Sequence, residues 1–367
     1  MSSSCGKRIR LSIFGQSHSA AVGAVIAGLP AGFRVDMARL DSFMKRRAPG
    51  GPLATPRREG DRIEFLSGIA GGRLCGSPLC LIIRNADARP GDYSEFRDVP
   101  RPGHADYTSS VKYGGFQDAS GGGHFSGRLT APLTAAGGVC LQILEARGIF
   151  VGAHLKSVGG VEDRAFDPAS VSRADFNARF FSPLTVLDAA AGARMAAAIE
   201  AARAEGDSLG GVVECAAVGL PAGLGEPIFG GLESGIASLV FGIPAVKGVE
   251  FGSGFAAAAM RGSEHNDPFV CEDGAVITAT NHAGGILGGI STGMPLVFRA
   301  AFKPTPSIAR AQRTLSLRTM QLTELNIKGR HDPCVAVRAV PAVEAAAAVA
   351  LCDALLPGNY EPLKGAE

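Results

Sequence analysis

One five-residue segment occurs twice in this chain. Gly28-Leu29-Pro30-Ala31-Gly32 recurs as Gly219-Leu220-Pro221-Ala222-Gly223. Each copy follows an apolar strand pattern, at 21–27 and 212–218, and precedes a helical pattern. The repeat predicts a duplicated strand–turn–helix unit in one pseudo-symmetric domain, although recurrence by chance is the alternative. Because no linker-like stretch is visible, we expect residues 1–367 to form a single domain, with a loose tail at 358–367.

The chain is also rich in glycine. It has 50 glycines in 367 residues, about twice the usual share of roughly 7%, without the Gly-X-Y period of collagen. The hydrophobic fraction of 46% is too high, and the net charge of +2 too small, for a disordered chain. The glycines therefore indicate backbone that adopts positive φ or approaches another group closely. The small net charge predicts no general attraction to nucleic acid or to a membrane.

The eight cysteines form no C-x-x-C pair. Cys140, Cys215 and Cys352 lie in apolar patterns, which predicts buried free thiols in a reducing, cytoplasmic environment. No apolar stretch reaches the ~18 residues of a membrane span. The apolar run near the N-terminus ends at Pro30, so we interpret it as a strand and not as a signal peptide. The histidines are too widely spaced for a zinc site, and no metal is expected.

Hydrophobic periodicity predicts an α+β protein. Helices are expected from an N-cap at Asp36 through Arg47, and at 131–147, 190–204, 232–241 and 340–356. Strands are expected at 8–14, 21–27, 63–66, 79–83, 212–218, and near 276–280 and 295–302. Between them, residues 84–127 and 243–333 are long and glycine-rich. Long irregular stretches in a compact domain are usually functional.

Three segments place histidine or aspartate beside groups that suit proton transfer. Ser17 and His18 share a turn between two expected strands. A hydroxyl next to an imidazole can hydrogen-bond to a leaving oxygen or transfer a proton. His104 lies between a rigid Pro-Gly pair and Asp106. Asp332 follows an Arg-His pair in the segment 329–334. Each histidine has a purely structural role as its alternative.

Other segments suit an anionic ligand. Residues 45–58 contain five cations and no acid, and arginine forks bind phosphate and carboxylate bidentately. The absence of aromatic residues there argues against a single-strand nucleic-acid platform, and a solvated surface run is the alternative. The glycines at 121–127 precede a helix and can bring N–H groups onto an anion, unless they form only a flexible loop. Four glycines within 284–289 indicate backbone packed against a flat ligand or another chain.

One motif points to a different chemistry. Residues 206–210, Gly-Asp-Ser-Leu-Gly, match the nucleophile elbow of serine hydrolases. That elbow needs a strand before it and a helix after it, whereas the expected order around Ser208 is helix and then strand. A serine hydrolase is therefore an unfavoured alternative, as is a non-catalytic anion- or nucleic-acid-binding protein.

Taken in order, these segments resemble the chorismate synthase family, from about residue 8 to residue 356. The resemblance rests on the Ser17-His18 turn, Thr55 to Glu59, Arg101 to Tyr107, 121–130, Asn281 to Gly289, Lys303-Pro304-Thr305 and Gly329 to Cys334. It implies an α+β fold, a β-α-β sandwich with a helical layer between two antiparallel sheets and pseudo-symmetric halves, assembled as a homotetramer. It implies a carbon–oxygen lyase that eliminates phosphate from 5-enolpyruvylshikimate 3-phosphate to give chorismate. The resemblance also implies that the reaction needs reduced FMN, although the reaction itself involves no net redox change.

The resemblance also implies roles for individual residues. His18 is expected near the leaving phosphate, His104 to protonate reduced flavin, and Asp332 to assist proton removal. Ser17 and Ser126 are expected to support hydrogen transfer. Substrate contacts are expected at Arg46, Arg47, Arg128 and Arg330, with Arg46 also contacting NADP. Flavin contacts are expected at His124, Phe125, Ser126, Pro244, Ala245, Gly288, Lys303, Pro304, Thr305, Pro306, Ser307 and Arg330.

Four departures from the commoner family pattern are visible in the sequence. Arg-Ser-Ser-Ala-Arg-Glu becomes His124-Phe125-Ser126-Gly127-Arg128-Leu129, and the first of three arginines becomes Lys45. An arginine linked to nicotinamide nucleotide falls on Pro52, and the glycine after Ser-His is Ser19. No G-x-G-x-x-G fingerprint is visible. Two sources of reduced flavin therefore stay open: reduction by NADPH on this chain, or supply from outside.

Overall fold

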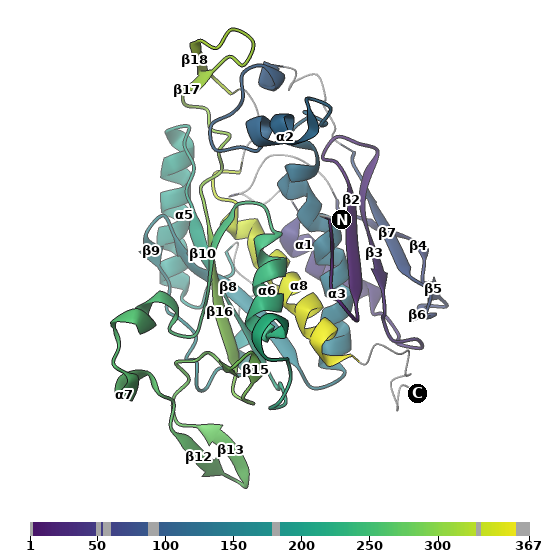
Figure 1. Cartoon of the computed structure of the whole chain (residues 1–367), viewed down its shortest axis with the longest axis vertical. Coiled ribbons are helices and arrows are strands. Elements are labelled where there is room, and N and C mark those ends of the chain that lie inside the picture. Colours follow the sequence, from purple (N-terminus) through teal and green to yellow (C-terminus); the bar gives the residue numbers. More distant parts are fainter. Residues whose placement is uncertain are drawn as a thin grey trace.

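Two five-stranded antiparallel sheets form the outer layers of the molecule (Figure 1). The structure is a computed structural model that describes residues 3–48, 53, 60–86, 95–177, 184–327 and 332–356. The strands of the first sheet are, in spatial order, β1 (Ser4–Cys5), β2 (Arg10–Gly15), β3 (Ala21–Ala27), β7 (Leu79–Arg84) and β4 (Ile63–Ser67). Those of the second are β11 (Val246–Phe251), β16 (Leu296–Phe302), β10 (Gly211–Val218), β8 (Phe150–Val158) and β9 (Val161–Glu162).

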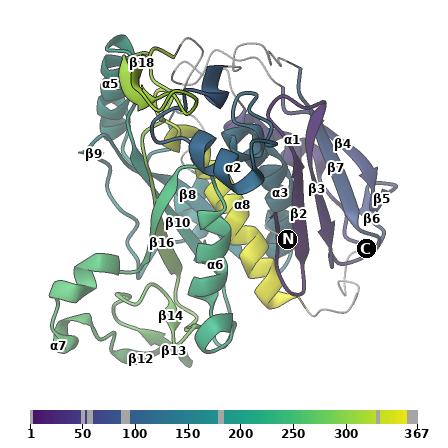
Figure 2. The ribbon, with the colours of Figure 1, turned by 45° about the horizontal axis from the view of Figure 1, so that its top comes forward.

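Helices fill the space between the sheets (Figures 1 and 2). Helix α3 (Thr130–Glu145) packs on β3 and β7, and α8 (Ala336–Leu355) packs on β8 and β10. The two helices pack on each other, and α1 (Met37–Arg47) and α6 (Leu232–Phe241) lie beside them. Small residues allow this packing, since a Cβ on Gly137 of α3 would lie 2.7 Å from the carbonyl oxygen of Ala345 in α8. Close packing in this layer therefore depends on glycine and alanine.

A further long helix, several short helices and four two-stranded sheets complete the described part of the fold. Helix α5 (Ala189–Ala204) packs beside β8 and β9, on the side away from the first sheet (Figure 1). The short helices are α2 (Asp106–Tyr113), α4 (Arg173–Asn177) and α7 (Gly262–His265). The two-stranded pairs are β5–β6 (Ile69–Ala70, Arg73–Leu74), β12–β13 (Phe269–Glu272, Ala275–Thr278), β14–β15 (Ile286–Leu287, Ile290–Ser291) and β17–β18 (Gln312–Leu315, Leu322–Leu325).

The topology repeats between the two halves. In chain order, β2, β3, α1, β4, β7 and α3 correspond to β8, β10, α6, β11, β16 and α8, and both sheets use the same spatial order of these strands. The two GLPAG turns are equivalent in position. Gly28 (φ 93°) lies against the backbone of Arg8 and Ile9 before β2, and Gly219 (φ 81°) lies against Gly148 and Ile149 before β8. This equivalence agrees with the predicted pair of related halves.

Most long periodic segments form the predicted element. The helix at 232–241 has the predicted bounds, and Asp36 caps α1 by accepting the amide of Arg39. Strands β8 and β11 were not predicted, nor was α2 inside the segment 84–127. Helix α8 begins at Ala336, before the predicted start at 340, and includes Pro341 near its N-terminal end. The predicted tail at 358–367 lies outside the described residues.

The cysteines are free thiols in two environments. All eight fall within the described residues, and none forms a disulfide there. Cys140, Cys215, Cys334 and Cys352 are buried, as the apolar patterns predict for three of them, but Cys75 and Cys271 are exposed. Across the described part of the chain, the helices are too short or too polar to cross a bilayer.

Candidate active site

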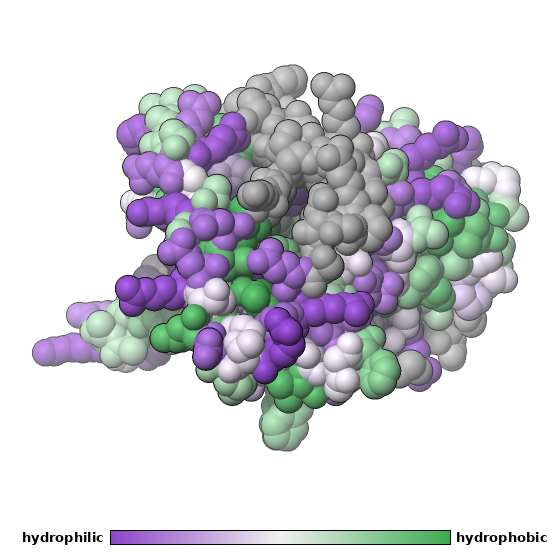
Figure 3. Space-filling model, turned by 90° about the horizontal axis from the view of Figure 1, so that it is seen from above, coloured by the Kyte–Doolittle hydropathy of each residue, from purple (hydrophilic) through white to green (hydrophobic). Residues whose placement is uncertain are grey.

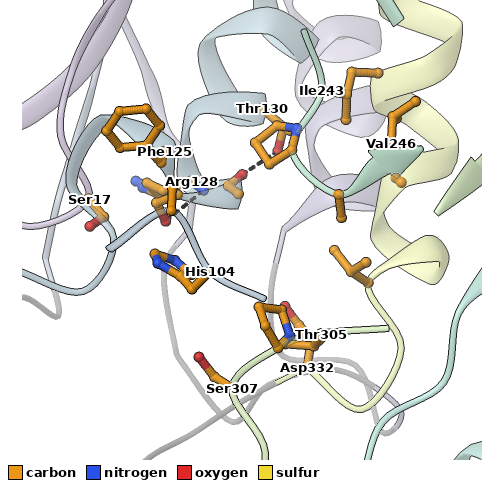
Figure 4. A pocket seen from close by; sticks show the side chains of 18 of the residues that line it. Ser17, His104, Phe125, Arg128, Thr130, Ile243, Val246, Thr305, Ser307 and Asp332 are labelled. Atoms are coloured by element: carbon orange, nitrogen blue, oxygen red, sulfur yellow. Dashed lines mark hydrogen bonds between the residues drawn. The ribbon is translucent and has the colours of Figure 1, made fainter. Parts of the chain in front are cut away.

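A cavity of about 510 Å³ opens between the two sheets, where several loops meet the ends of α6 and α8. Figure 4 shows Ser17, His104 and Arg128 on one side, with the apolar side chains of Ile243 and Val246 on the other. On the face seen in Figure 3, hydrophobic side chains sit among hydrophilic ones rather than in one continuous apolar patch. A concave site with one polar and one apolar wall suits a small ligand of mixed character.

His18 reaches the cavity from the turn between β2 and β3. Ser17 is buried, and its Oγ lies 3.0 Å both from the carbonyl oxygen of Ser120 and from Nδ1 of His18. A hydroxyl has one hydrogen to donate, and the carbonyl accepts it. Nδ1 of His18 therefore donates to Ser17 Oγ. The departure at Ser19 is accommodated locally, because its hydroxyl bonds with Gln16 and Ala21 and closes the turn.

His104 lies on the segment that leads into α2. Its Nδ1 lies 2.6 Å from Oδ1 of Asp106, whose carboxylate also accepts from the backbone and guanidinium of Arg101. Burial raises the pKa of Asp106, but the hydrogen bonds from Arg101 and His104 outweigh burial and hold that pKa well below its usual range. His104 therefore faces a carboxylate that stays ionised at neutral pH.

The glycine-rich segment 121–127 separates the two histidines. A Cβ on Gly121 would lie 2.5 Å from Nδ1 of His18, and one on Gly122 would lie 3.3 Å from Nε2 of His104. Glycine at these positions makes room for both rings. Further along, Ser126 caps a short turn at Arg128, and His124 bonds through its two ring nitrogens to Ser3 Oγ (2.7 Å) and Gly15 O (2.8 Å).

Arg47 and Arg128 share one buried carboxylate. Nη1 of Arg47 lies 2.5 Å from Oδ2 of Asp61, and Arg128 pairs with the other oxygen. All three side chains are almost fully buried, and the two arginines line the cavity. Burial lowers the pKa of Arg47 to about 10, although the charge of Asp61 opposes this shift. The nearby departure at Leu129 places an apolar residue in the core where the commoner pattern has glutamate.

Arg46 does not line this cavity. It pairs bidentately with Glu344 (2.6 and 2.8 Å) beside a smaller cavity of about 190 Å³. Glu344 also accepts the amide of Ala153, so the pair ties α1 to α8 and β8. The substrate and NADP contacts expected of Arg46 stay predictions, with Arg46 lining the smaller cavity and not the larger one. Lys45 is exposed, and Pro52 lies outside the described residues.

The segment 303–307 forms one edge of the cavity. Lys303 donates to the carbonyl oxygen of Gly103, and burial together with the charge of Lys247 lowers its pKa. Ser307 lies 3.3 Å from Nη1 of Arg101. Thr305 Oγ1 is buried and has no hydrogen-bond partner among the described residues. Lys303, Thr305, Pro306 and Ser307 line the cavity, as do the neighbouring Pro244 and Ala245, but Pro304 is not among the lining residues.

Asp332 lies beside the start of α8. Its Oδ2 accepts from Nη1 of Arg338 (2.7 Å), and Arg338 Nε donates to the backbone carbonyl of Arg47. Both Asp332 and Arg338 line the cavity. Arg330, predicted to contact substrate and flavin, lies outside the described residues.

Gly288 lies away from the cavity. It belongs to the turn between β14 and β15, next to Gly289, whose carbonyl accepts the amide of Leu232 at the N-terminal end of α6. The cavity is at the other end of α6, at Phe241. Gly288 is therefore remote from the cavity of its own chain, and the flavin contact expected there stays a prediction.

Ser208 has a structural environment. It lies between α5 and β10, in the helix-then-strand context that the sequence predicts. Its Oγ donates to the carbonyl oxygen of Thr305 (2.8 Å). The hydroxyl thus supports the 303–307 edge of the cavity and is not placed as a nucleophile on an elbow.

Sequence reasoning missed Asp61, Arg338 and the roles of Arg101 and Asp106. Arg338 was overlooked because the predicted helix began after it. Asp61 follows the cationic loop, but nothing in its neighbours signals that two distant arginines converge on it. Arg101 and Asp106 flank His104 in the sequence, and the opposite charges on either side of the histidine were the signal that could have found them.

Comparisons with known proteins agree on one family. Residues 9–356 match the family model described as chorismate synthase. A chorismate synthase of Aeropyrum pernix is 50% identical over 353 residues, covering 96% of this chain and 92% of the relative. One of Korarchaeum cryptofilum is 47% identical over 352 residues, covering 96% of each chain. A solved crystal structure of chorismate synthase superimposes with a TM-score of 0.76 at 27% identity, covering 96% of this chain and 93% of the other.

The family match spans both halves of the sandwich and every described loop that lines the cavity. The chain belongs to the chorismate synthase family.

Proposed function

We propose that this chain eliminates phosphate from 5-enolpyruvylshikimate 3-phosphate in a 1,4-anti sense and releases chorismate. The observation that carries the proposal is the placement of His18 and His104 on either side of the glycine turn at 121–122, facing one cavity. Family membership supplies the identity of the substrate. The geometry supplies two groups that can exchange protons at separate points of one bound molecule.

The charge of the cavity suits this substrate, which carries a phosphate and two carboxylates. Five described cationic side chains line it: Arg47, Arg101, Arg128, Lys303 and Arg338. Asp61, Asp106 and Asp332 pair with four of them, which leaves a formal excess of two positive charges (five minus three). Guanidinium groups fixed by carboxylates keep their orientation and can still donate to an anion.

The described residues fit a flat, phosphorylated cofactor such as FMN. The apolar wall at Ile243, Val246 and Val335 offers a surface for a ring system. The buried, unpartnered Thr305 Oγ1 and the neighbouring Lys303 offer polar contacts at the edge. When bound, reduced FMN supplies an electron transiently and eases cleavage of the allylic C–O bond. The 303–307 segment, Ala245 and Phe125 would hold it.

The side chains of the chain itself then handle protons and exclude water. His18, whose Nδ1 donates to Ser17 Oγ, would donate a second hydrogen bond from Nε2 to the leaving phosphate when its ring is protonated. His104 holds or releases a proton at Nε2. Asp332, whose carboxylate accepts from Arg338 and lines the cavity (Figure 4), would accept a proton from the substrate side. Ser126 holds Arg128 in the wall by accepting its amide.

The test is anaerobic turnover. Purified protein with chemically reduced FMN and the enolpyruvyl substrate should release one phosphate for each chorismate formed. Omission of FMN is the control and should abolish turnover. Well-folded protein that releases no phosphate would refute the proposal. Repeating the assay with oxidised FMN and NADPH, without another reductant, decides between the two sources of reduced flavin.

We also propose a homotetramer in the cytoplasm, as the family resemblance implies. The β12–β13 hairpin supports an assembly, because it projects from the body (Figure 1) and leaves Phe269 67% and Val276 69% exposed. A two-stranded hairpin is marginal in water unless something covers it. Light scattering during gel filtration should give four times the mass of one chain, and a monomer would contradict the proposed assembly.

A further inference from the structure

The two ring nitrogens of His104 lie in different surroundings. Nδ1 is 2.6 Å from Oδ1 of Asp106 and 3.1 Å from Nη2 of Arg101. Nε2 lies on the side of Gly122, where a Cβ would come within 3.3 Å of it. The ring lines the cavity and is only partly exposed. Each nitrogen therefore has a separate task.

The distances decide which nitrogen carries the hydrogen of the neutral ring. A carboxylate oxygen and a bare ring nitrogen are both acceptors, and two acceptors repel at 2.6 Å. Nδ1 must therefore hold a hydrogen and donate it to Asp106. The approach of Arg101 at 3.1 Å is then a contact between two donors, and its guanidinium bonds instead to the same carboxylate. In the neutral ring, Nε2 is left as an acceptor.

Asp106 is itself fixed in place. Its carboxylate accepts from Arg101 through the backbone amide (3.0 Å), Nε (2.8 Å) and Nη2 (2.7 Å). Arg101 is buried, lies over the ring of Phe96 at 4.5 Å, and donates to the carbonyl oxygen of Gly121. The carboxylate thus has little freedom to turn away from the imidazole.

We propose that Asp106 is a positioning residue that fixes the tautomer of His104 and directs its Nε2 into the cavity, with Arg101 as the support of that carboxylate. The catalytic part of this proposal rests on the proposed function. A proton then enters or leaves the ring only at Nε2. The hydrogen on Nδ1 stays in place, and Asp106 remains ionised in both states of the histidine.

The tautomer can be measured without substrate or cofactor. Proton–nitrogen correlation spectra of protein labelled in histidine show which ring nitrogen carries hydrogen, and loss of signals in His104→Gln identifies the residue. At a pH about two units above the ordinary histidine pKa of ~6.5, we expect hydrogen on Nδ1 and a bare Nε2. If both nitrogens carry hydrogen at that pH, the pH is raised until one hydrogen is lost. Loss from Nε2 supports the proposal, whereas hydrogen left on Nε2 alone overturns it.

A variant of Asp106 tests what the proposed positioning contributes to catalysis. Asp106→Asn presents an amide donor either to Arg101 or to His104, so the tautomer should be lost or mixed. We expect kcat to fall about 10²-fold with KM changed less than about threefold, since acid–base groups contribute roughly 10²–10⁴. Asp98→Asn is the matched control, because Asp98 also bonds to backbone and hydroxyl groups but lies outside the cavity lining.

A double variant separates positioning from general structural damage. If Asp106 acts through His104, Asp106→Asn combined with His104→Gln should be no slower than His104→Gln alone. Full additivity of the two losses, or unchanged kcat with an unchanged tautomer in Asp106→Asn, would overturn the proposal. If Asp106→Asn does not fold, the spectrum of the wild-type protein still decides the tautomer. Absence of turnover in the wild type would instead count against the proposed function.

Discussion

Two glycine-rich regions of this molecule, 121–127 and 284–289, use their glycines differently. At 121–122, the missing side chains make room for the imidazoles of His18 and His104. At 284–289, they make room for backbone. A Cβ on Gly284 would lie 2.7 Å from the Cα of Gly252, one on Gly285 2.5 Å from the carbonyl oxygen of Pro295, and one on Gly289 2.8 Å from the Cα of Gly231. Glycine content alone therefore does not locate a ligand.

The neighbours of each region explain the difference. Asn281 is buried, and its amide bonds to backbone groups of Pro168, Pro295 and Gly285. The second region thus holds several backbone segments together next to β16. The first region instead borders the cavity through Gly121, His124, Phe125, Ser126 and Gly127. Backbone of the same chain fills the space at Gly284, Gly285 and Gly289, whereas the space at Gly288 is open. The contact of 284–289 with a flat ligand or another chain stays a prediction.

The largest expected effect concerns the two rings that the first region accommodates. His18→Ala and His104→Ala should each lower kcat by roughly 10²–10⁴, the usual scale for acid–base groups, without loss of folding free energy beyond ~1 kcal/mol. His265→Ala, at a half-buried histidine of α7 outside the cavity lining, is the control. Turnover assays under anaerobic conditions measure the change. Wild-type kcat in either variant removes that residue from the mechanism.

The next effect tests the second region through stability. Gly285→Ala combines a φ of 83° with a clash against backbone, so we expect the free energy of unfolding to fall by at least ~2 kcal/mol. The kcat of the folded fraction should not change. Gly288→Ala is the matched control, since its φ of 63° is similar but nothing lies within 4 Å of its Cβ.

Denaturant unfolding and flavin titration of the Gly285→Ala and Gly288→Ala variants test whether this region has a structural role or binds flavin. Gly288→Ala should cost only ~1 kcal/mol of backbone strain and leave the affinity for FMN unchanged. Loss of flavin affinity in Gly288→Ala would restore the contact that the family resemblance implied there. Equal stability of Gly285→Ala and the wild type would contradict the structural role of the second region.

Gly121→Ala should lower kcat strongly and stability only slightly, which is the opposite of the result expected for Gly285→Ala. Its Cβ would enter the space of the His18 ring, which must then turn away from Ser17. We expect kcat to fall about 10- to 100-fold, with a loss of stability near ~1 kcal/mol from the positive φ. Gly32→Ala has a comparable φ of 82° and open space around the Cβ, and should retain full activity. A variant at Gly121 that loses stability but not kcat would erase the distinction between the regions.

The smallest expected effect concerns Ser208, which supports the 303–307 edge of the cavity. Ser208→Ala removes the hydrogen bond to the carbonyl of Thr305, which is worth about 1 kcal/mol. We expect a few-fold rise in the KM for FMN and an unchanged kcat. Complete loss of activity would favour a nucleophilic serine and the hydrolase alternative.

The sequence predicted what local patterns determine. The helix at 232–241, the cap at Asp36 and the strand at 21–27 follow from periodicity and capping. The site depended on residues far apart in the chain. Asp61 with Arg47 and Arg128, and Glu344 with Arg46, are pairs created by tertiary packing. Local patterns cannot show which arginine faces the ligand and which ties helices together.

The central claim is that ligands bind the first glycine-rich region and not the second. Hydrogen–deuterium exchange, measured with and without FMN and the enolpyruvyl substrate, tests it on every backbone amide at once. We predict that both ligands together slow exchange in 101–107, 121–128 and 303–309, and leave 281–289 unchanged. Protection at 281–289 without protection at 121–128 would contradict the account.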